Sequence, residues 1–247
     1  MQEWTLDLHI HTLLSPCGHD EMLPEAVIRR ALNKGIDVIA ITDHNSCGNV
    51  AAFVHKGFEE GLIVVPGMEL QTQEEIHLIC LFDRVKQALD FEKALEPRLT
   101  ALKNKPKIMG EQWFVDAAGD KLKQEERFLL ASVQISVDDA AALVHQFGGI
   151  CIAAHADRPA FSLSAVFGTI PAEIPLDGIE LTCHLERDPA LIEKIKALGF
   201  TYVTASDAHY LDSINDIHCA AYLDHWSVHE LRMAMKGQEG RKIITER

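Results

Sequence analysis

The sequence lacks several features that define large classes of protein. Its six cysteines form no Cys-x-x-Cys pair, so a disulfide framework or a structural zinc knuckle is not what organises the chain. No run of about eighteen apolar residues occurs, and no basic segment precedes an apolar stretch near Met1, so we expect no membrane span and no membrane partner. We therefore expect a cytoplasmic protein whose cysteines are mostly reduced core residues.

Basic residues are scarce. The chain has 23 Lys and Arg against 37 Asp and Glu, a formal net charge of -14 at pH 7. Such a surface repels phosphate backbones at long range, so we expect no binding of duplex nucleic acid unless cations or a local basic patch reverse the sign. Small phosphorylated substrates, nucleotides among them, remain compatible with this charge.

The chain has the composition of a globular protein with a real core, at 47% hydrophobic and 24% charged residues, and its 247 residues fit one large α/β domain. Short runs rich in Val, Ile, Leu or Thr predict buried strands, and helical patterns lie between several of them. The strands are expected at 5–10, 37–41, 62–66, 76–82, 150–154, 178–182 and 201–205, and the helices at 24–34, 49–59, 137–147 and 188–198. This alternation predicts parallel βα units in a closed or nearly closed barrel, with functional groups at the carboxyl ends of the strands.

One region interrupts the alternation. Residues 84–133 have few strand-like runs and a mixed-charge, mostly helical pattern. We expect an insertion that packs over or beside the site, where it either shapes substrate access or only adds surface. The tail, 228–247, predicts a last helix followed by a short strand or arm at Ile243 and Ile244.

Six of the thirteen histidines fall in five short motifs that border the apolar runs. The motifs are Asp7-Leu8-His9-Ile10-His11, Thr42-Asp43-His44-Asn45, Glu69 with His77 beyond it, His155-Ala156-Asp157, and Ser206-Asp207-Ala208-His209. Imidazoles and carboxylates are the ligands of borderline and hard divalent cations. A strand of period two places Asp7, His9 and His11 on one face, so the two imidazoles can converge on one ion. Asp7 either orients an imidazole or makes a plain buried hydrogen bond.

The remaining motifs each admit a second interpretation. Glu69 either bridges two cations through its carboxylate or is a solvated residue at the end of a strand. His77 is either a metal ligand or a hydrogen-bonded histidine of the core. Arg158, next to Asp157, is forked and fixed in charge, which suits a substrate phosphate or a surface ion pair equally. Glu180 ends a strand, where an orienting or substrate role is open, and we expect His184 and His218 to be structural.

Taken in order, these motifs resemble those of the PHP (polymerase and histidinol phosphatase) family of metal-dependent phosphoesterases. The resemblance runs from Asp7 to about His209, with the insertion as a gap. It implies a distorted (β/α)7 TIM-like barrel with a mostly helical insertion at about 84–133, and a single domain over residues 1–247. It also implies two or three divalent metal ions, usually zinc, manganese or iron.

The same resemblance implies a ligand set, assigned motif by motif. The first ion would be bound by His9, His11, Glu69 and Asp207, the second by Glu69, His77 and His155, and the third by His44 and His209. The third site's last ligand departs from the family pattern. By offset Cys17 takes that place, although His19 or Asp20 could also reach it.

The expected enzyme is a metal-dependent phosphoesterase that attacks a small phosphomonoester or a nucleotide with a metal-bridging hydroxide. Arg158 would stabilise the developing charge, and His44 or His209, if not bound to metal, would protonate the leaving oxygen. An amidohydrolase-type hydrolase and a non-catalytic, metal-stabilised regulatory module of a polymerase are the alternatives. The sequence leaves the oligomeric state open.

Overall fold

The computed structural model describes residues 1–183, 186–214 and 219–245, so His184 and His218 lie outside the described residues. The strands are β1 (Gln2–Ile10), β2 (Val38–Ile41), β3 (Ile63–Gln71), β4 (His77–Leu81), β5 (Trp113–Val115), β6 (Lys121–Gln124), β7 (Ile150–Ala153), β8 (Gly178–Thr182), β9 (Tyr202–Ala205), β10 (Ala220–Leu223) and β11 (Lys242–Ile244). The helices are α1 (Pro24–Asn33), α2 (Val50–Glu60), α3 (Val85–Leu95), α4 (Pro106–Met109), α5 (Val137–Gln146), α6 (Leu163–Phe167), α7 (Pro189–Ala197) and α8 (Val228–Met235), with 3₁₀ turns η1 (Glu96–Arg98) and η2 (Leu211–Ser213).

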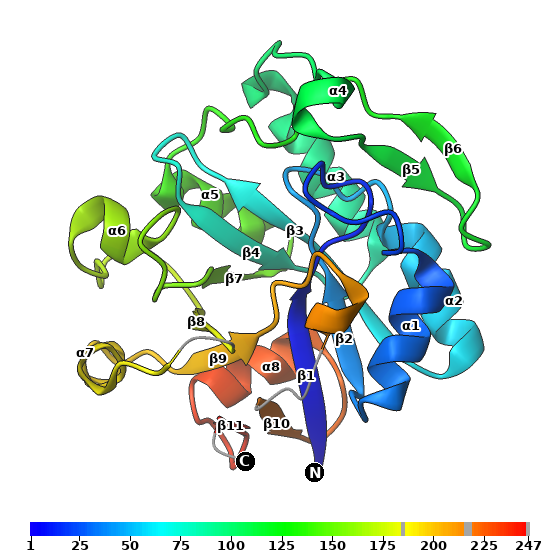
Figure 1. The fold of residues 1–247 in the computed structure, drawn as a ribbon. Helices are drawn as coiled ribbons and strands as arrows, with labels where there is room; N and C mark the ends of the chain where they lie inside the picture. Colours follow the sequence, from blue (N-terminus) through cyan, green and yellow to red (C-terminus); the bar gives the residue numbers. More distant parts are fainter. Residues whose placement is uncertain (184–185, 215–218, 246–247) are drawn as a thin grey trace.

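Nine strands form one sheet in the order β11-β10-β1-β2-β3-β4-β7-β8-β9. The seven strands expected from the sequence are the consecutive run from β1 to β9 (Figure 1). The two edges of this run approach each other at a bridge between Ile10 and Ala208, where the amide of His11 donates to the carbonyl of Ala208 at 2.9 Å. The sheet is therefore a nearly closed barrel, and the predicted fold class is confirmed.

The barrel is distorted at β4. This strand runs antiparallel to both of its neighbours, β3 and β7, while β1, β2 and β3 are parallel to one another, as are β7, β8 and β9. The turn between Gln71 and His77 is too short for a crossover, so the chain can only return antiparallel. Residues Leu78 to Leu81 are nonetheless fully buried, as expected for a barrel strand.

Two further strands extend the sheet beyond the barrel. The amino-terminal half of β1, Gln2 to Thr5, pairs with β10, and β11 pairs with β10. The short terminal strand expected at Ile243 and Ile244 is thus confirmed, whereas β10 was not anticipated. β10 and β2 lie on opposite edges of β1, with β10 paired along Gln2 to Thr5 and β2 paired from Leu6 to Ile10.

Helices surround the strands on the outside, with α1 and α2 to one side and α6 and α7 to the other (Figure 1). The predicted helices form where the sequence provides their boundaries. Pro24 opens α1, Gly61 ends α2 with a φ of 80°, and the side chain of Ser136 accepts the amide of Asp139 at the start of α5. In the described ranges no helix combines the length and apolar content that crossing a membrane requires.

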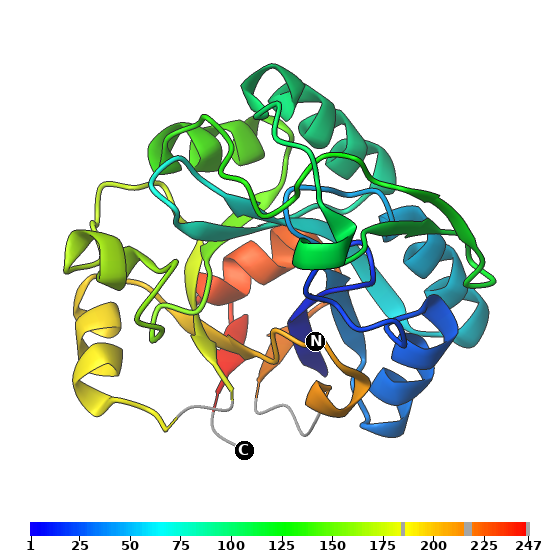
Figure 2. The same cartoon turned by 45° about the horizontal axis from the view of Figure 1, so that its top comes forward.

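The segment 84–133 contains α3, α4 and the antiparallel β5–β6 hairpin, which the sequence did not suggest. It packs against the loops that follow β1 and β2. The amide of Trp113 donates to the carbonyl of Leu13 at 2.9 Å, and Asn49 donates to the carbonyl of Trp113 at 3.1 Å. In Figure 2 the segment lies across the end of the barrel toward which β1 runs. Its status as an insertion in one domain stays a prediction.

Candidate metal centre

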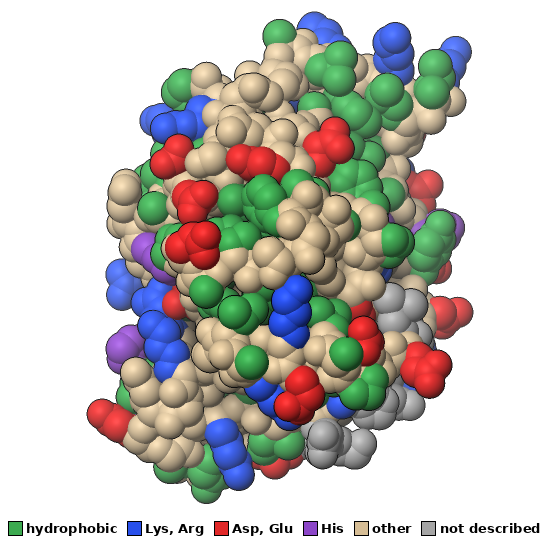
Figure 3. Space-filling model, turned by 90° about the vertical axis from the view of Figure 1, so that its left-hand side faces the viewer, with side chains coloured by type: hydrophobic (Ala, Val, Ile, Leu, Met, Phe, Trp, Pro, Cys, Tyr) green, Lys and Arg blue, Asp and Glu red, His purple; other side chains and the backbone are tan. Residues whose placement is uncertain are grey.

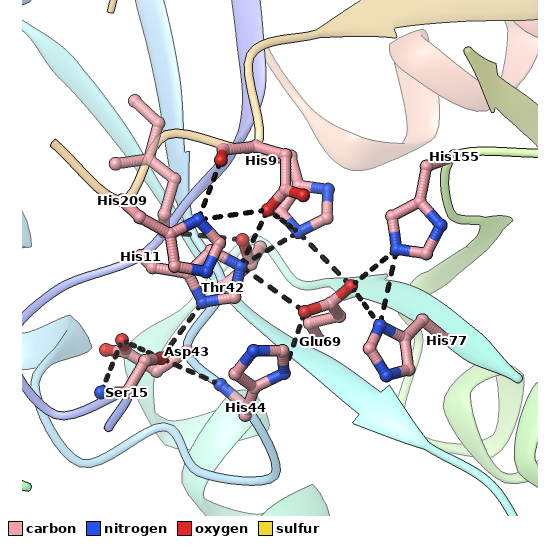
Figure 4. A network of polar contacts seen from close by, with 12 residues as sticks. His9, His11, Ser15, Thr42, Asp43, His44, Glu69, His77, His155 and His209 are labelled. Carbon is pink, nitrogen blue, oxygen red and sulfur yellow. Dashed lines mark hydrogen bonds and ion pairs between the residues drawn. The ribbon is translucent and has the colours of Figure 1, made fainter. Parts of the chain in front are cut away.

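The carboxyl end of β1 supplies two fully buried imidazoles. His9 and His11 lie on the same face, and their Nε2 atoms are 3.1 Å apart (Figure 4). The carboxylate of Asp207, which follows β9, lies against both: its Oδ1 is 3.2 Å from the Nε2 of His9 and 3.0 Å from that of His11. The structure therefore brings the ends of β1 and β9 together at one point.

Glu69, near the end of β3, is the centre of the cluster (Figure 4). Its Oε1 lies 2.7 Å from the Nδ1 of His77 and 3.2 Å from the Nε2 of His155, and its Oε2 lies 2.8 Å from the Nδ1 of His44. The same carboxylate is 3.3 Å from the Nε2 of His11. Glu69 is only 1% exposed, so neighbouring protein groups rather than solvent surround its two oxygens.

A third grouping joins His11 to His44 and His209, whose ligand atoms lie within 4.8 Å of one another. The ring centroids of His11 and His209 are 4.1 Å apart. Cys17 is exposed and belongs to none of the three groups of potential ligands found among the described residues. Its role as a ligand stays a prediction.

The two alternatives to Cys17 are engaged elsewhere. His19 pairs with Glu21 at 3.4 Å, and Asp20 pairs with Lys121 of the β6 strand at 3.0 Å. Both side chains are exposed. The structure thus places neither His19 nor Asp20 within the cluster of imidazoles.

Hydrogen bonds fix which nitrogen of His9 and His11 carries the proton. The Nδ1 of His9 is 3.0 Å from both carboxylate oxygens of Glu180. The Nδ1 of His11 is 2.9 Å from the Oγ of Ser15, which itself donates to Asp43 at 2.7 Å and must therefore accept from His11. In the neutral form of each ring the proton is held on Nδ1, so the lone pair on Nε2 points into the cluster.

His77 and His209 are anchored in the same way. The Nε2 of His77 donates to the Oε1 of Gln71 at 3.1 Å, which leaves Nδ1 facing Glu69. The Nδ1 of His209 donates to the backbone carbonyl of Asp207 at 2.8 Å, which leaves Nε2 free. An acceptor on the far side of the ring is the usual environment of a metal-binding imidazole.

The cluster fits divalent cations, because several of its atoms have no partner that protein alone can supply. Ring nitrogens face each other at 3.1 Å between His9 and His11, and at 3.3 Å between the Nε2 of His155 and the Nδ1 of His77. One buried oxygen of Glu69 and one of Asp207 have no hydrogen-bond partner. The contacts of 3.0–3.4 Å match the roughly 3.3 Å edge of a tetrahedron of ligands about 2.0–2.1 Å from an ion.

The protonation equilibria differ among the groups of the site. Burial alone would raise the pKa of Glu69, but the surrounding imidazoles, His77 foremost, hold it well below its ordinary range. Burial lowers the pKa of His44 to about 4 and that of His209 to about 3. The pKa of His11, by contrast, is raised to about 9 and that of His9 is also raised, because burial is outweighed by Asp207 and Glu69 and, at His9, by Glu180. Since ligands must be deprotonated, a cation bound here would have to displace a proton from these two rings.

Several supporting residues differ from what the sequence suggested. Asp7 accepts from the amide of Ser206 at 3.1 Å and from its hydroxyl, so it makes a buried hydrogen bond and orients none of the described imidazoles. Glu180 is the residue that orients His9. The contribution of Gln71 was missed, although period two along β3 places it on the same face as Glu69 and could have revealed it.

The cluster opens into a cavity of about 560 Å³, a size typical of small-ligand sites. One wall is polar and consists of the imidazoles and carboxylates. Arg158 lines the cavity with its side chain 36% exposed, and its Nη1 lies 2.6 Å from the Oδ2 of Asp207. Its neighbour Asp157 instead accepts from Thr182, so the surface ion pair considered for these two residues does not form. Leu130 of the segment 84–133 also lines the cavity.

Comparison with known proteins relates this site to nucleases. The profile of the PHP domain matches residues 7–166 of the 247. A 5′-3′ exoribonuclease of Haemophilus influenzae is 27% identical over 243 residues, which span 97% of this chain and 74% of that protein.

Solved structures share the fold at lower sequence identity. The lesion-specific endonuclease PfuEndoQ of Pyrococcus furiosus superposes with a TM-score of 0.68 at 19% identity, covering 98% of this chain and 58% of that one. Endonuclease Q in complex with a 27-mer duplex, with an abasic lesion at the active site, superposes with a TM-score of 0.67 at 18% identity and the same coverage. This chain thus spans less than two thirds of either endonuclease chain.

The expectation that a protein of this charge excludes duplex nucleic acid, and acts on small phosphorylated compounds instead, is wrong. A chain of this fold has been captured on duplex DNA, and the full-length relative is named an exoribonuclease. The reason lies in where the acidic groups sit. Glu69 and Asp207 are buried at the site, where they face imidazoles and Arg158, so the net charge does not describe the potential that a phosphate would meet.

Proposed function

The chain belongs to the PHP family, and from that membership we propose that it is a divalent-metal-dependent phosphodiesterase that removes nucleotides from the end of a nucleic acid, RNA foremost. The observation that carries the proposal is the convergence of imidazoles on Glu69, with unpaired lone pairs and oxygens turned toward one another. The similarity to an exoribonuclease over nearly the whole chain supports RNA as the substrate.

The proposed ligands are those the sequence suggested. They are His9, His11, Glu69 and Asp207 for one ion, Glu69, His77 and His155 for a second, and His44 and His209 for a third, with Cys17 as its further candidate. Divalent cations held here would activate water and polarise the phosphoryl oxygens. Zinc, manganese and iron all accept this set of nitrogen and oxygen ligands.

Protein groups would bind and orient the phosphate beside this cluster. Arg158 faces Asp207 at the cavity wall, and its forked guanidinium can exchange that carboxylate for a phosphodiester. His209 is the more exposed of the two candidates for protonating the leaving oxygen, at 22% of its side chain, but its pKa is lowered to about 3, so near neutral pH it is better suited to bind an ion. His44 is nearly buried, which favours its role as a ligand.

The test is digestion of matched oligonucleotides by purified protein supplied with Mn²⁺ or Zn²⁺. We expect mononucleotides to be released stepwise from 5′-phosphorylated single-stranded RNA, as resolved by mass spectrometry, with the matching DNA, a duplex and a simple amide as comparison substrates. Glu69→Gln protein, prepared in parallel, controls for contaminating nucleases. Cleavage of no oligonucleotide beyond the level of that variant would refute the proposal.

A further inference from the structure

Most of the described residues that adopt left-handed backbone angles without being glycine lie at or next to the cavity. Among the described residues other than glycine, those with positive φ are Asn45, Glu75, His155, Phe161, Asp207 and Glu239. His155 and Asp207 are proposed ligands, and Asn45 directly follows His44. Glu75 and Phe161 line the cavity but belong to no metal group. Strained backbone persists at functional sites, where the surroundings hold it in place, so these two residues need an explanation beyond metal binding.

Of these two residues, Phe161 has the less favourable backbone conformation for its side chain. Its φ of 58° is a genuine outlier for a bulky side chain, and the residue is 43% exposed instead of buried in the core. Its ring stacks on that of His77, with centroids 4.8 Å apart and planes 19° apart, and its carbonyl accepts the amide of His77 at 2.9 Å. The backbone thus holds an aromatic ring against the metal cluster and in contact with the cavity.

The cavity has two chemically different sides. Imidazoles and carboxylates form the side that faces the proposed ions. The other side contains Leu130, Pro159, Ala160 and Phe161, which offer apolar surface and one aromatic plane. A nucleotide has the same two-part chemistry, a phosphate joined to a planar base, and every base can stack on an aromatic side chain.

Exposure alone does not distinguish Phe161. The face that carries α6 and α7 shows hydrophobic side chains gathered over its middle among acidic and basic groups (Figure 3). Phe167 of α6 is also 43% exposed, but it does not line the cavity and has φ in the ordinary range. What sets Phe161 apart is its position beside His77.

We infer that Phe161 is the stacking platform of a nucleobase subsite, which holds the base of the nucleotide whose phosphate lies at the metal cluster. This inference rests on the proposed phosphodiesterase function and specifies how that site selects a nucleotide over another phosphate ester. Because the phenyl ring already stacks on His77, a base added to it lies within the span of one nucleotide from the ions. Leu130, Pro159 and Ala160 cover the base edge with apolar surface.

The experiment compares substrates that differ only in the base. One RNA oligonucleotide carries a normal terminal nucleotide, and its partner carries an abasic sugar phosphate at the same position. Binding is measured separately, by calorimetry on the Mn²⁺-loaded protein, with a nucleoside 5′-monophosphate against ribose 5-phosphate. The wild type should favour the base-bearing compound about 5- to 150-fold in KM and in Kd, the range measured for single stacked bases.

The variants separate stacking from folding. Phe161→Gly should fold normally, because glycine adopts a φ of 58° without strain, yet it should lose the preference for the base, read as the ratio of kcat/KM on the base-bearing and abasic substrates with metal content measured alongside. Phe161→Trp should restore the preference. Phe167→Ala, which removes an equally exposed phenylalanine outside the cavity, should behave as wild type.

Each result has a defined meaning. Cleavage of RNA in which wild type and Phe161→Gly favour the base equally would overturn the subsite and leave the phosphodiesterase proposal standing. Binding that favours the base through Phe161 in a protein that cleaves no oligonucleotide would support the subsite and overturn the proposed function. Loss of metal together with loss of base preference in Phe161→Gly would overturn the stacking role in favour of a purely structural one.

Discussion

The carboxyl end of the barrel gathers Glu69 with several imidazoles, whereas the amino end of β8 places Asp177 between Arg232 and His145. Asp177 accepts from the Nε of Arg232 and the Nε2 of His145, both at 2.8 Å, and from the amide of Cys151 at 2.9 Å. None of these polar atoms is left unsatisfied. Around Glu69, by contrast, imidazole nitrogens crowd the carboxylate, one of its buried oxygens makes no hydrogen bond, and the ring nitrogens of His9 and His11 face each other.

The difference separates a structural charge cluster from one that needs further cations. At Asp177 the protein provides the positive charge itself, through a guanidinium that cannot lose its proton. At Glu69 the ion pairs among the described residues are all with imidazoles, and Arg158, which also lines the cavity, contacts Asp207 instead. A buried carboxylate left in this state is costly, so the folded chain is arranged for charge that arrives from outside.

Removal of the central carboxylate should have the largest effect. Glu69→Gln keeps the shape but removes the charge shared by the imidazoles, so metal content and phosphodiesterase activity should fall by more than the roughly 10- to 100-fold typical of losing an orienting hydrogen bond. Elemental analysis and initial rates check this. Full metal content in Glu69→Gln would show that the cluster around Glu69 does not depend on this carboxylate to bind cations, and the contrast with the cluster around Asp177 would be wrong.

Metal loading should stabilise the fold through the carboxyl end alone. At a free ion concentration 100 times the Kd, each site adds about 2.7 kcal/mol to the free energy of unfolding. Thermal unfolding with Mn²⁺ or Zn²⁺, against the same protein treated with a chelator, measures the shift. The Glu69→Gln variant should lose most of it, and a shift of equal size in both proteins would place the ions elsewhere.

Asp177→Asn should destabilise the fold by about 1.5–3 kcal/mol, because Arg232 loses a charged partner, while metal content stays unchanged. The pKa of Asp177 is lowered: burial opposes this shift, but the hydrogen bond from His145 and the contact with Arg232 prevail. A lowered pKa stabilises the fold above the unfolded pKa of about 3.9, and this contribution is lost as the pH falls through the folded value. In urea denaturation measured from pH 6 downward, the free energy of unfolding of the variant should therefore fall less steeply with decreasing pH than that of the wild type.

The control for that measurement is Asp90→Asn. Asp90 pairs with Lys86 on the exposed surface of α3, and such a pair contributes less than about 1 kcal/mol. If Asp90→Asn lowered the free energy of unfolding as much as Asp177→Asn, burial would not distinguish the two ion pairs.

Gln71→Leu tests orientation at the metal centre and should have the smallest effect. It removes the acceptor for His77, so the affinity for metal should fall about 10- to 100-fold while the fold persists. Competition with a metal-sensitive dye measures the affinity. Gln73→Leu, on the exposed turn beyond β3, is the matched control, and an unchanged affinity in Gln71→Leu would remove the residue from the site.

The parts of this arrangement that follow from local sequence could be predicted. Period two along β1 placed His9 and His11 on one face, and the apolar runs located all seven barrel strands. The reversal of β4 could not be read from its residues, because a buried strand has the same apolar pattern in either direction. β10 was missed because two of its four residues are alanine, which is depleted in strands.

Contacts between distant segments were the least predictable. The sequence placed Asp7 near an imidazole but could not show that Ser206 would take its oxygens. Cys17 has the family offset but belongs to none of the groups of potential ligands found among the described residues, and the offset alone could not show where the loop after β1 places its thiol. Phe161 gave no signal at all, because its importance comes from a left-handed backbone angle and from the ring of His77, which lies more than eighty residues earlier in the chain.

The barrel closes where β1 meets β9, and only a short contact around Ile10 and Ala208 joins these two edges. His9 and His11 stand on one side of that seam, and Asp207 and His209 on the other. Ions bound across it would cross-link the first and last strands of the barrel. The metal site and the closure of the barrel would then depend on each other. The backbone amides of His11 and Ala208 would exchange hydrogen with solvent more slowly when metal is bound.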